Sequence, residues 1–271
     1  MADRTLSGAA YTTAANWTGA TEPVDGDRAL IPSTLGVDVV GGDRGSIDLA
    51  LLNVSEGFNY RFCSSGTPLK GAADLIRVAG STGFYFECSL DGATASKVDD
   101  CRIQLPSRDT PFELGSETAD AGDWDAIEVL RGKGTLKGNI MFGAACVLKA
   151  GYVSSRFDDV NLTISPGADT LPELQLLGGA CVADNVITLG HIYGRHTQRT
   201  AAMTTGRVYP GGVLDYEHTS STLIEVYPGG TLNLKTNGGI VKAITTLIEW
   251  PGAIIIRDDA IHTFTTHKRY P

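Results

Sequence analysis

The chain has 271 residues and a net charge of −9, from 22 Lys and Arg against 31 Asp and Glu. Its 42% hydrophobic and 20% charged residues supply a core and exclude a disordered chain. There are 33 glycines, and each one inside a helix costs about 1 kcal/mol, so the composition excludes a helical bundle and predicts many tight turns.

Two partner classes are disfavoured by the distribution of charge and hydropathy. The basic residues are scattered, whereas a non-specific nucleic-acid binder needs a basic stripe. No apolar run approaches the roughly 20 residues that span a bilayer. We therefore expect neither nucleic acid nor a membrane as a partner.

Residues 1–26 are small, polar and non-periodic, and they are predicted to form an extended N-terminal arm or a cap. The arm contains Asn16 and Trp17. The first residues show no basic segment followed by an apolar one, so we expect synthesis in the cytoplasm without a cleaved signal.

Residues 27–261 are dominated by an internal repeat. Its five clearest units begin at Leu174, Gly190, Gly206, Ile224 and Ile248, with spacings of 16, 16, 18 and 24 residues. Each unit reads as a short alternating strand, a glycine corner and a second strand. Such a unit is too short for a βαβ crossover, which takes about 30 residues, and fits one coil of a parallel solenoid. Antiparallel hairpins explain the alternation but not the recurrence of one ordered motif. We therefore predict an all-β, right-handed parallel β-helix, with an acidic insertion at about 105–125.

Stacking the coils in register predicts columns of equivalent side chains. The inward column contains Leu176, Ile192, Val208 and Val226, with Trp250 near its end. One outward column contains Leu177, Tyr193, Tyr209 and Tyr227, and a second contains Gln175, His191, Arg207, Glu225 and Glu249. Stacked tyrosines and an Arg207–Glu225 pair are what such ladders favour. Residues 262–271 form a mildly basic tail that we expect to be a closing strand.

The opening of the chain carries a resemblance. Asn16–Gly19, Pro23, Gly26–Asp27 and Ala29–Pro32 match an N-W-x-G…P…G-D…I pattern. Further matching segments are Leu52–Val54, Gly57–Phe58, Ser64–Leu69 and the later Gly-Gly-Thr-Leu repeats. Together they resemble virion structural proteins of tailed bacteriophages.

The resemblance implies a capsid decoration (cement) protein or a tail spike or fibre, usually a homotrimer. About 26 residues before the first coil leave room for an arm but not for a head domain, which favours decoration. The implied partners are the major capsid protein and sister subunits, and the implied location is the outer surface of the virion. The alternatives are a tail spike or fibre that binds or cleaves host surface polysaccharide, and a bacterial surface adhesin.

Candidate chemistry is sparse. The pairs Asp99–Asp100, Asp158–Asp159 and Asp258–Asp259 would point to opposite faces of a strand, so none is a glycosidase pair by itself. Glu225 and Glu249 would be neighbours on one face, but Arg207 is next in line, which favours a solvated ladder.

Metal and thiol chemistry has equally little support. His191, His196 and His218 lack the spacing of a metal site, and no phosphate loop or nucleophile elbow occurs. The cysteines are odd in number, lack a C-x-x-C pair and are expected to be buried thiols: Cys63, Cys88, Cys101, Cys146 and Cys181.

We therefore predict no catalytic, cofactor-binding or metal-binding residue. The predicted interface residues are Asn16, Trp17, Tyr193, Arg207, Tyr209, Glu225 and Tyr227.

Overall fold

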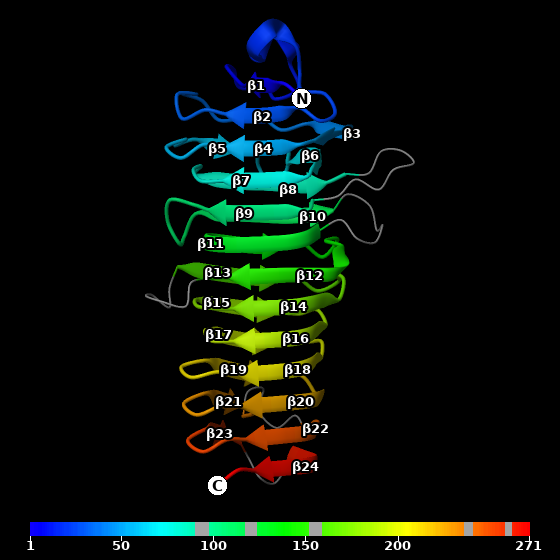
Figure 1. Cartoon of the computed structure of the whole chain (residues 1–271), viewed down its shortest axis with the longest axis vertical. Coiled ribbons are helices and arrows are strands. Elements are labelled where there is room, and N and C mark those ends of the chain that lie inside the picture. Colours follow the sequence, from blue (N-terminus) through cyan, green and yellow to red (C-terminus); the bar gives the residue numbers. More distant parts are fainter. Residues whose placement is uncertain (90–97, 117–123, 152–158, 236–240, 258–261) are drawn as a thin grey trace.

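The computed structural model describes residues 1–89, 98–116, 124–151, 159–235, 241–257 and 262–271. Strands stack in coils along one long axis, with the N-terminus and the C-terminus at opposite ends (Figure 1). The strands form two sheets in which neighbours run parallel, and the described residues contain no α-helix. The predicted all-β parallel solenoid is confirmed.

The strands of the first sheet, in stacking order, are β1 (Asp3–Thr5), β2 (Arg28–Ile31), β4 (Leu51–Val54), β7 (Leu75–Val78), β9 (Asp100–Gln104), β11 (Trp124–Leu136), β12 (Phe142–Ala150), β14 (Leu171–Leu176), β16 (Ile187–Ile192), β18 (Met203–Val208), β20 (Ser220–Val226), β22 (Lys242–Glu249) and β24 (His262–Arg269).

The strands of the second sheet are β3 (Asp43–Leu49), β6 (Leu69–Ala73), β8 (Gly83–Cys88), β10 (Pro111–Ser116), β13 (Val160–Ile164), β15 (Ala180–Ala183), β17 (Arg195–Gln198), β19 (Val213–Tyr216), β21 (Thr231–Asn233) and β23 (Ile254–Ile256), and the short β5 (Arg61–Phe62) pairs with β8. The long strand β11 belongs to both sheets, since it pairs with β9 and β12 and also with β10 and β13.

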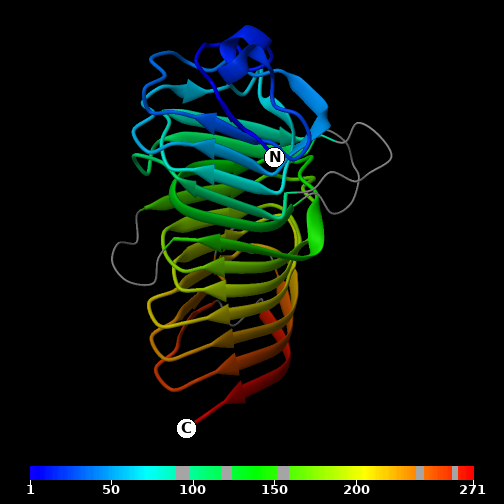
Figure 2. The same ribbon diagram turned by 45° about the horizontal axis from the view of Figure 1, so that its top comes forward.

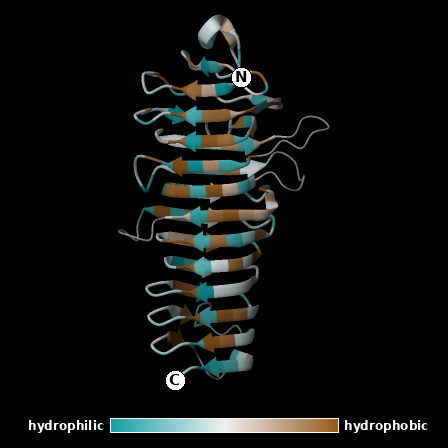
Figure 3. Ribbon diagram, viewed as in Figure 1, coloured by the Kyte–Doolittle hydropathy of each residue, from teal (hydrophilic) through white to brown (hydrophobic). Residues whose placement is uncertain are grey.

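The core lies between the two sheets and follows from alternation along each strand (Figure 3). The predicted inward column is confirmed: Leu176, Ile192, Val208 and Val226 are opposite one another in successive strands and are fully buried. In the N-terminal half of the second sheet an inward column is aromatic, because Phe84 of β8 is opposite Phe62 of β5 and stacks on it at 5.3 Å between ring centroids. Burial of these columns is the main stabilising force of the fold.

Residues 1–26 form a folded cap rather than an extended arm. Strand β1 pairs in parallel with β2, and the chain then returns through the 3₁₀ turns η1 (Ala14–Asn16) and η2 (Thr18–Ala20). Trp17 forms an antiparallel bridge to Leu6 and packs edge-on against Tyr11 at 4.9 Å. The reason is physical: an uncovered first coil would expose apolar side chains and an open strand edge. Figure 2 shows the cap over the first coils.

The two segments that were expected to lie outside the regular coils contain strands. Within 105–125, β10 pairs in parallel with β8 and β11, so this part is a coil strand and not an insertion, while residues 117–123 lie outside the described chain. The C-terminal tail forms β24, which pairs with β22 as the predicted closing strand.

The last coils differ by one residue from the expected register. Glu249 is opposite Val226, and Ile248 is opposite Glu225, so Glu249 does not continue the outward column that contains Glu225. The cause is the turn, because Trp250-Pro-Gly aligns with Tyr227-Pro-Gly. Trp250 directly follows its Ile-Glu pair, whereas Val226 separates Tyr227 from the preceding Ile-Glu pair. Trp250 therefore joins the tyrosine column and not the inward one.

Candidate interaction surface

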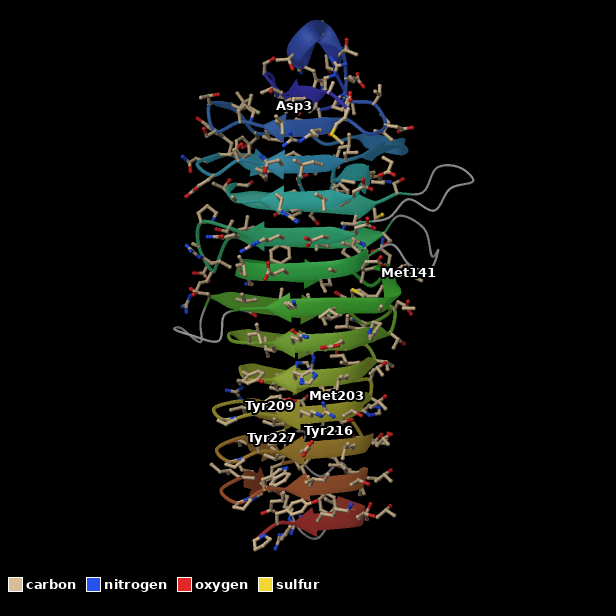
Figure 4. All side chains as sticks on the ribbon, in the orientation of Figure 1. Asp3, Met141, Met203, Tyr209, Tyr216 and Tyr227 are labelled. Carbon is tan, nitrogen blue, oxygen red and sulfur yellow. The ribbon has the colours of Figure 1, made fainter. Side chains whose placement is uncertain are left out.

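An aromatic stack runs along the outside of the first sheet, immediately after its strands end. Its ring centroids are separated by 4.2 Å (Tyr193–Tyr209), 4.9 Å (Tyr209–Tyr227), 6.1 Å (Tyr227–Trp250) and 4.4 Å (Trp250–Tyr270), and neighbouring planes are tilted by 15° or less. Tyr209 and Tyr227 are labelled in Figure 4, where they lie on consecutive coils. The predicted tyrosine column is confirmed and extends over five rings, which we call the aromatic stack.

Similar Pro-Gly turns follow the three middle rings of the aromatic stack, Tyr209, Tyr227 and Trp250. Tyr209 accepts a hydrogen bond from the N–H of Gly212 at 2.9 Å, and the corresponding bonds close the turns after Tyr227 and Trp250. Gly211 has φ +82°, which an L side chain adopts only with strain, and a Cβ on Gly212 would lie 2.2 Å from the carbonyl oxygen of Ile192. Proline followed by glycine is the preferred pair for such a turn.

A polar row lies beside the aromatic stack. Arg207 and Glu225 are 3.7 Å apart, which confirms the predicted pair, and the indole of Trp250 donates to Glu225 at 2.9 Å. Burial, together with the hydrogen bond to Glu225 and its charge, raises the pKa of Tyr227 to about 12, so its hydroxyl stays protonated. His191 Nδ1 lies 2.9 Å from the hydroxyl of Tyr209. Tyr209, Tyr227 and Trp250 are thereby fixed by stacking and by a polar contact.

The cap that contains Asn16 and Trp17 lies at the N-terminal end of the solenoid, whereas the aromatic stack follows strands β16 to β24 toward the C-terminal end (Figure 1). Trp17 is 2% exposed, and its indole donates to the carbonyl oxygen of Tyr11 at 2.7 Å. The side-chain amide of Asn16 donates to Ala10 at 2.9 Å. The prediction that Trp17 anchors a partner is therefore wrong, since this side chain belongs to the core of the cap.

Two of the candidate carboxylates, Asp100 and Glu249, are paired with basic side chains. Asp100 lies 2.5 Å from Arg77, and Glu249 contacts His267 and Arg269, each at 2.9 Å. Asp158, Asp258 and Asp259 lie outside the described residues. Carboxylates held in this way are structural ion pairs. Asp99 differs, because burial together with the charges of Asp74, Asp25 and Asp99 raises the pKa of Asp48, so these carboxyl groups lie near one another.

The histidines and cysteines occupy separate places in the coils. His191 lies on the first sheet, whereas His196 is buried on the second and bonds to Gln198 at 3.0 Å. Over the described part of the chain, no group of three His, Cys, Asp or Glu is arranged to hold a metal ion. All five cysteines are buried free thiols, as predicted. Burial raises the pKa of Cys146 and Cys181 to about 12, so both stay protonated.

Two members of the aromatic stack, Trp250 and Tyr270, were not predicted from the sequence. The sequence feature that indicates the place of Trp250 in the stack is the Pro-Gly that follows it, which matches the Pro-Gly after Tyr209 and Tyr227. Tyr270 has no following glycine, so its place depends on the pairing of β24 with β22.

Comparison with protein-family models, with curated proteins and with solved structures yielded no match. In the described residues there is no helix of the length and apolar character needed to span a bilayer. The resemblance to phage virion proteins therefore rests on the sequence motifs.

Proposed function

We propose that the protein is a non-enzymatic structural protein of a bacteriophage virion that decorates the outer surface of the capsid and stabilises the shell. The sequence resemblance supplies the virion assignment. The stiff, regularly laddered solenoid supports a structural role, because parallel coils stacked along one axis hold many side chains in fixed positions.

The aromatic stack carries this proposal. Its rings are held parallel by their neighbours and by polar contacts from His191 and Glu225, so they lose little rotamer freedom when a partner covers them. Tyr, Trp and Arg are the residue types that dominate protein interfaces. We therefore assign the contact with the major capsid protein or a sister subunit to this face of the first sheet, and not to the cap.

The pairing of Glu225 and Glu249 supports a non-enzymatic role. A glycosidase needs two carboxyl groups about 5 to 9.5 Å apart across a substrate. Glu225 and Glu249 are each bound to basic or indole groups of neighbouring coils instead.

Binding through many copies on a closed shell needs only modest affinity at each site.

The proposal is tested on particles released by the organism that encodes the chain. Particles are purified by density gradient, searched for the protein by mass spectrometry and labelled with immunogold. We expect the protein to co-purify in many copies and the label to lie on the heads. Label confined to tails, or a protein absent from the particles, would contradict the assignment.

Add-back of purified protein to particles that lack it then tests the face. Arg207→Ala is expected to lower occupancy about tenfold or more, as loss of an interface arginine does. Ile254→Ser, which alters a 51% exposed side chain of the second sheet, is the matched control and is expected to bind normally. Normal binding by Arg207→Ala together with loss by Ile254→Ser would assign the contact to the second sheet.

A further inference from the structure

The two ends of the solenoid differ in how their outermost strand is covered. At the N-terminal end the cap of residues 1–26 lies over the first coils (Figure 2). At the C-terminal end the outermost strand of the first sheet is β24, and β22 is its one partner among the described strands (Figure 1). The backbone N–H and C=O groups that alternate away from β22 therefore face out along the axis. Such an edge is a template for pairing with a further strand.

The core is also incompletely covered at the C-terminal end. Phe264 continues the inward column after Ile244, which is 1% exposed, yet Phe264 is only partly buried. Ile255 likewise follows the fully buried Leu232 and is itself partly exposed. The guanidinium of Arg257 lies 5.3 Å from the centroid of the Phe264 ring. A partner that adds a further layer at this end would remove these apolar groups from water.

The order of inward and outward side chains along β24 reads the same in both directions about its midpoint. Phe264 and His267 are opposite buried residues of β22, so both face the core. The two threonines between them face outward, as do Thr263 and Lys268 on either side. An antiparallel copy of β24 therefore brings inward side chains opposite inward ones and outward side chains opposite outward ones, as pairing over a shared core requires.

The charges of β24 are also compatible with a copy of the same strand. In the antiparallel arrangement Lys268 comes opposite Thr263 of the second copy, so the basic ends of the two strands lie apart. Arg269 and His267 already contact Glu249 of their own chain, each at 2.9 Å. The central Thr-Phe-Thr-Thr contains no charge, proline or glycine. Threonines that face each other across two strands are favourable neighbours.

We propose that two copies of the chain associate end to end by antiparallel pairing of their β24 strands, about a two-fold axis that passes between Thr265 and Thr266. Phe264 of each copy is then opposite His267 of the other, and the partly exposed apolar groups of both last coils are covered. A two-fold contact is closed, because both copies use the same surface. It produces dimers, or hexamers where the chains also form trimers.

The test uses the purified full chain, without particles, so its outcome is independent of the proposed role on a capsid. The number of chains in each species is measured by sedimentation velocity and mass photometry over a range of protein concentrations. We expect species with an even number of chains, whose share rises with concentration. Monomers at every concentration, or trimers as the largest species, would overturn the proposal.

Charge-exchange variants of Thr263 and Lys268 locate the contact, because the proposed register places these residues opposite each other twice. Thr263→Lys brings like charges together and is expected to raise the dissociation constant about fivefold or more. Adding Lys268→Glu to Thr263→Lys makes each pair one of opposite charges and is expected to restore association.

Ser220→Lys is the matched control, because it adds the same charge at the equivalent exposed position of β20, two coils from the edge. It is expected to associate like the unmodified chain. Equal association of Thr263→Lys and the unmodified chain, or a double variant that does not regain association, would overturn the proposed contact.

Discussion

Individual residues of this solenoid have different roles according to the face on which they lie. Tyr209, on the outside, touches a ring on each side and a histidine, so it contributes through stacking. His196, on the inside, occupies the buried column between Cys181 and Leu214 and needs a polar partner there. Gln198 supplies it, and the Gln198 amide donates to Asn185 and Ala201.

His196 makes stability depend on pH. Burial lowers the pKa of His196 to about 4, against an ordinary value of about 6.5. As the pH falls below 6.5 the unfolded chain takes up a proton that the folded chain resists. The stabilisation is therefore complete above pH 6.5 and is lost toward pH 4, by about 3 kcal/mol at most.

The measurement is the free energy of unfolding by urea between pH 4 and 7. His196→Leu introduces the same side chain as Leu214, which is opposite it on the next coil. We expect the difference in free energy of unfolding between this variant and the unmodified chain to shrink as the pH falls. His218→Gln, at the surface, is the matched control and should leave that difference constant. Parallel pH curves for His196→Leu and the unmodified chain would show that His196 does not contribute this dependence.

At the scale of elements, the Tyr-Pro-Gly-Gly turns set the register of the strands that they join. The turns bond to one another along the axis, since Gly211 N–H donates to Gly229 and Gly229 N–H donates to Gly252. Because the turns stack on one another, Trp250 lies next to Tyr227 in the aromatic stack. It does so even though the repeat that contains Trp250 has one residue fewer before its turn. Register is thus specified at the corners as well as by the core.

Gly212 is the sharpest test of these turns. In Gly212→Ala the new methyl group would meet the carbonyl oxygen of Ile192, which is part of the β16 backbone, so the turn must shift. We expect a loss of about 1–3 kcal/mol, measured by thermal and urea unfolding. Gly66→Ala adds the same group where nothing lies within 4 Å and should change stability little. Equal stability of both variants would mean that the corner tolerates a side chain.

At the scale of the whole molecule, the cap makes residues 1–26 inseparable from the coils. Leu6, Tyr11 and Trp17 belong to the same buried cluster as the first strands. Removing residues 1–26 would therefore uncover both apolar surface and the edge of β2, and a truncated chain is expected to associate and lose structure. Because the chain without residues 1–26 is expected to lose structure, it cannot be used to test particle binding.

Trp17→Ala tests the cap without truncation. Loss of a buried tryptophan costs about 3–5 kcal/mol. We expect a lower melting temperature, stronger binding of an apolar dye and association into larger species than the unmodified chain forms. Thr13→Ala, in the exposed part of the same segment, should behave like the unmodified chain. A Trp17→Ala protein that is equally stable and no more associated would indicate a cap that is not part of the core.

The sequence by itself determined the parallel solenoid, because the recurrence of a strand–glycine–strand unit every 16 to 24 residues admits few other folds. It also determined the inward column and the stacking of Tyr193, Tyr209 and Tyr227, since alternation along a strand assigns faces. Only the tertiary structure decided the place of Trp17, Glu249 and Trp250. The non-periodic cap gives no pattern to read, and in the last repeat the turn, not the strand, sets the register.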